Sequence, residues 1–180
     1  MTSRALRMLD LSKRHPGISE GISQSFAEAA RVCLDRHHTP PADFQLADNA
    51  HEEAATADWI AVDWRLKNAW ANKDDATEYG AYAMALAAIE LTRGLVAVMR
   101  AETRSGVDYY LGESRGDLDN VEVSLCFEVS GTDGGNAAAI RARLRDKVDQ
   151  AARGRANLPA IACVVGFAAR QIVSLDVVKK

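Results

Sequence analysis

The segment VEVSLCFEVS, residues 121–130, alternates between two kinds of side chain. Val, Leu and Phe occupy the odd-numbered positions, and Glu, Ser and Cys occupy the even-numbered ones. Because successive side chains of a β-strand point to opposite faces, the segment is expected to form a strand with one apolar and one mixed face. Glu128 lies on the mixed face, where a buried carboxylate needs a partner.

Three further segments in the second half of the chain predict strands. Residues 107–111 (VDYYL) place Asp108 opposite a face of apolar and aromatic side chains. The runs at 95–100 (LVAVMR) and 160–167 (AIACVVGF) are apolar and rich in β-branched residues, which is typical of buried strands. The tail at 171–178 (QIVSLDVV) could add an edge strand.

Helical periodicity flanks these strands. Residues 76–93 are rich in Ala, Leu, Met and Glu, and Gly94 is expected to end the helix that they form. A second helix is predicted over 136–154, after the Gly-rich turn GTDGGN at 131–136. The order is therefore helix, three strands, helix, strand, which predicts an α/β (α+β) fold with a mixed sheet.

The N-terminal region, residues 1–74, is predicted to be helical. Apolar residues recur at spacings of three and four over 19–38, and a second helix is expected over 54–70 after a polar connector. These stripes are too few to make a separate core. We therefore expect the region to dock on a core formed by 75–180, and its helices are a candidate surface for a homo-oligomer or a protein partner.

The overall composition, 48% hydrophobic and 26% charged, is typical of a globular protein. The net charge of −3 gives no global positive field that would attract nucleic acid. No apolar run approaches the length of about 18 residues that a membrane span requires. The three scattered cysteines predict reduced thiols and a cytoplasmic location.

Positive charge is concentrated between residues 141 and 155. Two acidic residues, Asp146 and Asp149, stand there among six basic ones: Arg141, Arg143, Arg145, Lys147, Arg153 and Arg155. Such a cluster can contact the phosphates of a nucleic acid, or it can form an ordinary solvated helix face.

Asp108 and Glu128 are the candidate metal ligands. Adjacent antiparallel strands could bring their faces together, and two close carboxylates repel each other unless a cation joins them. Mg²⁺ prefers oxygen ligands and usually needs only one or two carboxylates, with water and phosphate completing its shell. The two acids therefore predict a site for Mg²⁺ or Mn²⁺.

Two residues on the predicted helices complete the candidate site. Glu78 lies on an otherwise apolar stripe and has capping-box spacing from Asp75, so that it caps the helix, faces a site, or does both. Lys147 shares the apolar side of its helix with Ile140 and Leu144. Its ammonium could neutralise the two carboxylates, or it could extend past the sheet into solvent.

This order of elements, with acids on the first helix, the second strand and the third strand, resembles the PD-(D/E)xK nuclease superfamily. That superfamily includes restriction endonucleases and Holliday-junction resolvases, and the resemblance covers roughly residues 75–170. It implies a restriction-endonuclease-like αβββαβ core. It also implies that Asp108 and Glu128 hold a metal ion and that Glu78 is the helix acid seen in many members.

The sequence departs from the family pattern at two positions. Val107 stands where the family has proline, and Ser130 stands where it has the lysine that follows the second acid. Some members supply that lysine from the following helix, which implies this role for Lys147. Gln150 then resembles the glutamine or basic residue that some members carry on the same helix.

The resemblance implies a Mg²⁺-dependent nuclease, acting on DNA rather than RNA, in defence or repair. Glu78, Asp108, Glu128 and Lys147 are the expected catalytic residues. The residues expected to contact substrate are Ser130, Arg141, Arg143, Arg145 and Gln150. Two alternatives stay open: a non-catalytic adaptor or regulatory module on the same fold, and a protein that binds a nucleotide or another small ligand between the two regions.

Overall fold

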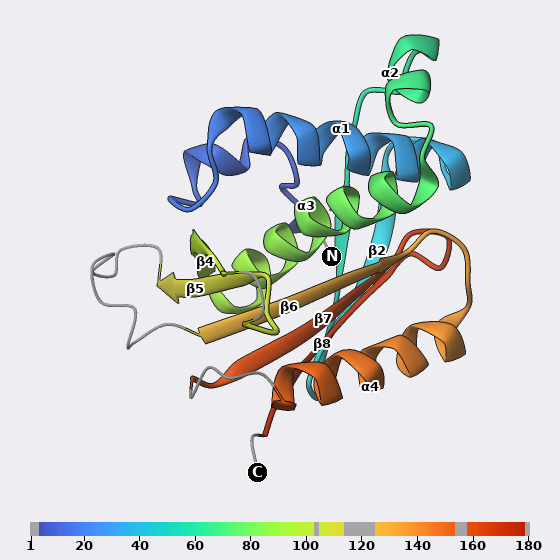
Figure 1. Ribbon diagram of the computed structural model, residues 1–180. Helices are drawn as coiled ribbons and strands as arrows, with labels where there is room; N and C mark the ends of the chain where they lie inside the picture. Colours follow the sequence, from blue (N-terminus) through green and yellow to red (C-terminus); the bar gives the residue numbers. More distant parts are fainter. Residues whose placement is uncertain (1–3, 103–104, 114–124, 154–157, 179–180) are drawn as a thin grey trace.

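The structure, a computed structural model, describes residues 4–102, 105–113, 125–153 and 158–178. In these ranges the chain forms a mixed sheet with helices on both faces (Figure 1). This arrangement confirms the α/β class and the mixed sheet. None of the helices in the described ranges combines the length and the apolar character that crossing a bilayer requires.

Eight strands of the described chain pair into one sheet in the order β1-β3-β2-β8-β7-β6-β5-β4. Neighbours pair antiparallel, except that β1 with β3, β2 with β8 and β6 with β7 are parallel. The strands are β1 Arg4–Ala5, β2 Ala42–Asp48, β3 His51–Ala57, β4 Leu95–Arg100, β5 Tyr109–Glu113, β6 Leu125–Thr132, β7 Ala160–Gly166 and β8 Gln171–Val177.

The helices form layers around the sheet. They are α1 Glu20–His37, α2 Trp64–Ala69, α3 Lys73–Arg93 and α4 Ala137–Arg153, with a short 3-10 turn at Leu11–Lys13. In Figure 1, α3 lies between the sheet and α1, while α4 covers the opposite face. Gly80 of α3 permits the close approach of α1, because a Cβ there would lie 3.0 Å from the backbone of Ala30.

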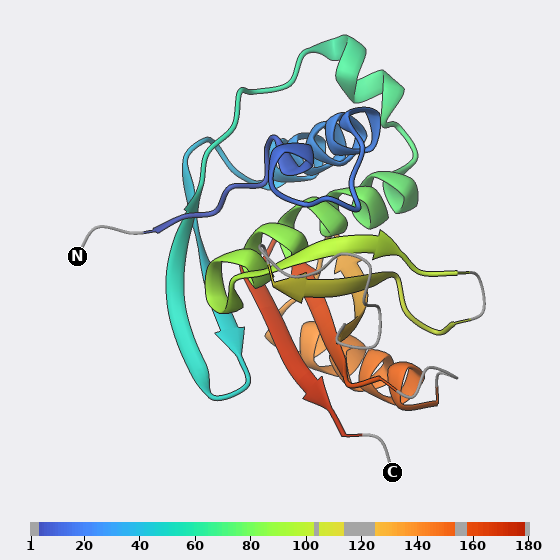
Figure 2. The same cartoon turned by 90° about the vertical axis from the view of Figure 1, so that its left-hand side faces the viewer.

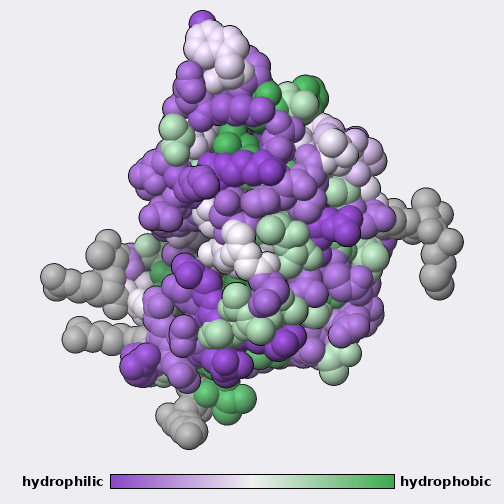
Figure 3. Space-filling model, turned by 90° about the vertical axis from the view of Figure 1, so that its right-hand side faces the viewer, coloured by the Kyte–Doolittle hydropathy of each residue, from purple (hydrophilic) through white to green (hydrophobic). Residues whose placement is uncertain are grey.

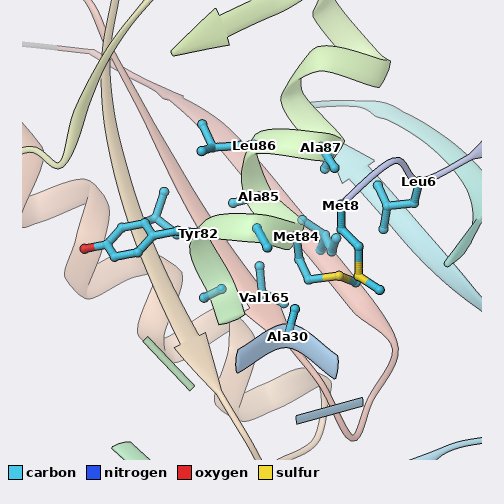
Figure 4. Close-up of a cluster of buried hydrophobic side chains, with 14 of the residues drawn as sticks. Leu6, Met8, Ala30, Tyr82, Met84, Ala85, Leu86, Ala87 and Val165 are labelled. Atoms are coloured by element: carbon cyan, nitrogen blue, oxygen red, sulfur yellow. The ribbon is translucent and has the colours of Figure 1, made fainter. Parts of the chain in front are cut away.

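One hydrophobic core joins the N-terminal region to the rest of the chain. Phe26 and Leu34 of α1 belong to the same buried cluster as Tyr82 of α3 and Phe127 of β6. Figure 4 shows part of this cluster, in which Leu6, Met8 and Ala30 meet side chains of α3. A smaller cluster lies between α4 and the other face of the sheet, around Ile140.

The segments predicted from the second half of the chain lie in the expected elements. Residues 95–100, 125–129 and 160–166 are strands of one sheet, and α3 and α4 occupy the predicted helical segments. The strand predicted over 107–111 is β5, which begins only at Tyr109, so that Asp108 lies just before the strand. Residues 121–124 of the predicted third strand lie outside the described residues. The predicted edge strand is β8, but it lies inside the sheet between β2 and β7.

The expected helix over 54–70 is wrong. Residues 51–57 form β3, which pairs with β2 in a hairpin that extends the sheet (Figure 2), and only the six-residue α2 is helical. The polar connector is itself β2, whose Ala42, Phe44 and Leu46 are buried in alternation with exposed residues. Pairing across the sheet overrides the helical preference of the alanines in 54–57.

Candidate functional site

The candidate site forms where β5 and β6 separate. Their ladder ends at the pair Tyr109–Phe127. Beyond it, the backbone N–H of Val129 donates to Oδ2 of Asp108 at 2.8 Å, so that a side chain takes the role of a strand carbonyl. Asp108 is thereby fixed at the point where the two strands diverge.

A cavity of about 830 Å³ opens at this divergence, between α3, the β4–β5 connection, β6 and α4. Among the described residues, six carboxylates and four cationic side chains line it. The carboxylates are Asp74, Glu78, Glu102, Asp108, Glu128 and Asp133, and the cations are Lys73, Arg100, Arg143 and Lys147. One of these carboxylates, Asp133, also pairs with Arg36, which does not line the cavity, at 3.0 Å. The remaining carboxylates still outnumber the cations by one, so a phosphate in the cavity would be favoured only with a cation beside it.

Asp108 is held by two donors from different elements. Besides the Val129 N–H on Oδ2, the hydroxyl of Tyr82 donates to Oδ1 at 2.7 Å. Figure 4 shows the hydroxyl of Tyr82 pointing away from the aliphatic side chains of the core. Burial, followed by the charge of Asp108, raises the pKa of Tyr82, which keeps its proton on this bond.

Glu128 of β6 and Lys147 of α4 form an ion pair that joins the sheet to the helix. Lys147 Nζ lies 2.6 Å from Oε1 of Glu128 and 3.0 Å from Oε1 of Gln150. The Glu128 side chain is only 4% exposed. Burial, followed by repulsion from Asp108, raises the pKa of Glu128 to about 7, although Lys147 acts in the opposite direction.

The location of Glu78 decides between its two interpretations. The N-cap of α3 is Asn72, whose side chain accepts the backbone N–H groups of Asp74 and Asp75, so Asp75 does not cap the helix. Glu78 lies in the second turn, lines the cavity, and has Oε1 3.4 Å from the Tyr82 hydroxyl. The capping-box interpretation is therefore wrong, and Glu78 faces the candidate site.

The five predicted substrate contacts separate into two groups. Ser130, Arg143 and Gln150 line the cavity, and Arg143 Nε donates to Oγ of Ser130 at 2.6 Å. Arg141 and Arg145 are exposed on α4 and do not line it. A ligand in the cavity would thus meet the first group, whereas the other two arginines could contact only a ligand that extends along α4.

The acids fit a metal ion that keeps part of its water shell. Within the described ranges, no three His, Cys, Asp or Glu side chains converge as a ready-made ligand cluster. Mg²⁺ does not need such a cluster, since one or two carboxylates usually hold it. Each carboxylate oxygen can accept more than one bond, so the protein donors on Asp108 and Glu128 leave capacity for a cation.

Two residues of the site were not predicted as such. In the sequence, Tyr82 is one aromatic residue within the predicted helix over 76–93, and Arg100 is the last residue of a predicted strand. Arg100 lines the cavity, and its Nη2 lies 3.3 Å from the Tyr82 hydroxyl. The spacing of Tyr82 four residues after Glu78 was the available signal, because such residues share a helix face.

Comparison of the chain with models of known families, with curated proteins and with solved structures gives no match.

Proposed function

We propose that the protein is a divalent-metal-dependent nuclease that hydrolyses phosphodiester bonds, with DNA as the favoured substrate. The observation that carries the proposal is the convergence of Asp108, Glu128 and Lys147 on one open cavity. The ammonium of Lys147 contacts the carboxylate of Glu128, and the negative charge of Asp108 helps to raise the pKa of Glu128. Asp108 comes from the β4–β5 connection, Glu128 from β6 and Lys147 from α4, and all three line this cavity.

In this proposal Asp108 and Glu128 hold Mg²⁺ or Mn²⁺. When bound, the ion supplies water activation and charge neutralisation. Lys147 stabilises the charge that develops on the phosphate, and Gln150 orients its ammonium. Glu78 sits at the same cavity, where it can position water, while Ser130 and Arg143 face the bound phosphate.

The test pairs a binding measurement with an activity measurement. Melting of the full chain with and without millimolar Mg²⁺ or Mn²⁺ reports metal binding, and labelled single- and double-stranded DNA and RNA report cleavage. We expect stabilisation by the metal and cleavage of at least one substrate. Unchanged melting together with intact substrates would overturn the proposal.

Substitutions in the site separate the roles. Glu128→Gln should remove both the metal-dependent rise in melting temperature and the cleavage, because one carboxylate is too few to retain the ion. Lys147→Ala should keep most of the rise while lowering the rate, since its contribution belongs to the transition state. Loss of the metal effect in Lys147→Ala would contradict the separate roles.

A non-catalytic adaptor is the second candidate, and two observations favour it. The acids already have protein partners, Tyr82 and Val129 for Asp108 and Lys147 for Glu128. In addition, Ile60 in the connection before α2 and Trp64 at the start of α2 are 78% and 70% exposed. This helix projects from the molecule at the top of Figure 1, and the top of Figure 3 shows the same projection from another side. An adaptor predicts no metal effect on melting, and loss of partner binding when Ile60 and Trp64 are replaced by serine.

A further inference from the structure

Arg100 contacts two aromatic rings at the edge of the cavity. Its guanidinium carbon lies 4.8 Å from the ring centroid of Tyr82 and 4.7 Å from that of Tyr109. Both tyrosines are buried, at 4% and 1% exposure. The two rings are nearly perpendicular, with an interplanar angle of 79°. The guanidinium therefore lies in the corner that they form, where the ring quadrupoles attract it without cancelling its charge.

Asp108 does not form a hydrogen-bonded ion pair with Arg100. Nη2 of Arg100 lies 3.7 Å from Oδ1 of Asp108, whereas the hydroxyl of Tyr82 occupies the same oxygen at 2.7 Å. The Arg100 side chain is 50% exposed and lines the cavity. An arginine that served only to neutralise Asp108 would be expected at hydrogen-bond distance from its carboxylate.

Arg100 faces the same cavity as the cations of α4. Lys147 and Arg143 line it from α4, and Arg100 lines it from the end of β4. A guanidinium presents several N–H groups in a fixed fork that matches the oxygens of a phosphate. A phosphodiester in the cavity would therefore meet cations from two different walls.

We propose that Arg100 binds a phosphate group of the nucleic-acid substrate, with Tyr82 and Tyr109 holding its guanidinium in place. This inference rests on the proposed nuclease function, since it names a residue that contacts the substrate of that site. It also assigns the two tyrosines a positioning role, because their rings fix the arginine without neutralising it.

The test measures how a fluorescein-labelled single-stranded oligodeoxynucleotide binds to the full chain in Ca²⁺. Fluorescence anisotropy reports the binding at several salt concentrations. Arg100→Gln should weaken binding by about tenfold or more, as the loss of a charge-assisted contact does. It should also reduce the slope of log affinity against log salt by about 1. Arg100→Lys, which keeps the charge but loses the fork, should fall between wild type and Arg100→Gln.

Arg65→Gln is the matched control. Arg65 also stacks on an aromatic ring, with its guanidinium carbon 5.9 Å from the centroid of Trp64, but it is exposed on α2 and does not line the cavity. It should leave the affinity within about twofold and the salt slope unchanged. Melting curves of all three variants verify that each is folded.

The outcomes distinguish the two proposals. If wild type binds and cleaves DNA while Arg100→Gln keeps wild-type affinity and salt slope, the assignment of Arg100 is overturned and the nuclease function stands. If Arg65→Gln weakens binding as much as Arg100→Gln, the effect is one of net charge and the assignment is again overturned. If wild type neither binds the oligonucleotide nor cleaves DNA or RNA in Mg²⁺ or Mn²⁺, both proposals fail.

Discussion

The ammonium of Lys147 lies 2.6 Å from Oε1 of Glu128, although the two residues are 19 positions apart in the sequence. Glu128 projects from β6 toward α4, and Lys147 points back from α4 toward the sheet. A cation therefore reaches the second acid from a helix rather than from the position two residues along the strand, where Ser130 stands. Ser130 instead accepts a hydrogen bond from Arg143, so that each of these β6 side chains has a partner on α4.

The first prediction concerns how stability depends on pH. Burial and the charge of Asp108 raise the pKa of Glu128 from its ordinary value of 4.5 to about 7 in the folded protein. Between these values the folded state holds a proton that the unfolded state has lost, so stability present below about pH 4.5 is lost as the pH rises through about 7. Glutamine does not ionise, so the free energy of unfolding of Glu128→Gln should not fall in this way. Between pH 5 and 8 it should exceed that of wild type by about 1 to 3 kcal/mol.

Urea denaturation of both proteins across this pH range measures the effect. Glu102→Gln, at an exposed carboxylate that lines the same cavity, controls for the removal of one negative charge. Parallel pH profiles for wild type and Glu128→Gln would show that the Glu128 carboxylate is not held in its protonated form.

A second prediction concerns the hydroxyl of Tyr82, which donates to Asp108 and also accepts a hydrogen bond from Nη2 of Arg100 at 3.3 Å. Tyr82→Phe keeps the ring that packs on Phe26 and Arg100 but removes the hydroxyl that donates to Oδ1 at 2.7 Å. Loss of a hydrogen bond to a partly buried carboxylate should lower the free energy of unfolding by about 1 to 3 kcal/mol. Tyr79→Phe on the same helix, where the side chain is 41% exposed, should change it by less than about 0.5 kcal/mol. Equal stability of the two variants would contradict a structural role for the Tyr82 hydroxyl.

The elements that local periodicity encodes were predictable from the sequence. Alternation around Glu128 and the alanine-rich helix before Gly94 are visible without any tertiary information. The β2–β3 hairpin was missed for a different reason in each strand. In β2 the alternation of Phe44 and Leu46 with polar residues was present but short, whereas the alanines of β3 have no strand preference and are extended only because β2 and β1 pair with them.

The site divides in a similar way. The acids stood out because they interrupt strand patterns, and Lys147 stood out because it interrupts the apolar side of a helix. Arg100 carries no such signal, because an arginine at the end of a strand is ordinary. Its importance arises from Tyr82 and Tyr109, which come from different elements and meet only in the folded chain.

A third prediction concerns the contact between α3 and β6 beneath the cavity. A Cβ on Gly131 would lie 2.7 Å from the carbonyl oxygen of Thr77 and 2.9 Å from Cβ of Ala81, and a helix backbone cannot yield without moving α3. Gly131→Ala should therefore cost about 1 to 3 kcal/mol of stability in a urea denaturation. Gly134→Ala is the control, since nothing lies within 4 Å of the added Cβ. A tolerated Gly131→Ala would mean that α3 and β6 are less tightly packed than the structure has them.

The last prediction concerns the contacts that attach β2 to the rest of the fold. Arg93, at the end of α3, donates from Nε to Oδ2 of Asp48 at 2.7 Å and from Nη1 to Oδ1 of Asp176 at 2.7 Å. The hydroxyl of Ser174 donates to the other oxygen of Asp48 at 2.7 Å. A single guanidinium thus connects α3 to both β2 and β8. The β2–β3 hairpin, which the sequence did not predict, joins the rest of the sheet through the pairing of these two strands.

Arg93→Met removes these bonds and leaves the Asp48 side chain, 12% exposed, without its cation. Burial opposes ionisation of Asp48, but the bonds from Arg93 and Ser174 outweigh it and lower the pKa of this carboxyl. The lowered pKa contributes stability at neutral pH that is lost as the pH falls through the folded-state value. The substitution should therefore cost about 1 to 3 kcal/mol at pH 7 and clearly less near pH 3.

Arg4→Met, which breaks a more exposed pair with Glu53, should cost no more than about 1 kcal/mol. Denaturation of both variants at the two pH values measures this difference, and an equal cost of Arg93→Met at both would refute the electrostatic account of how β2 is held.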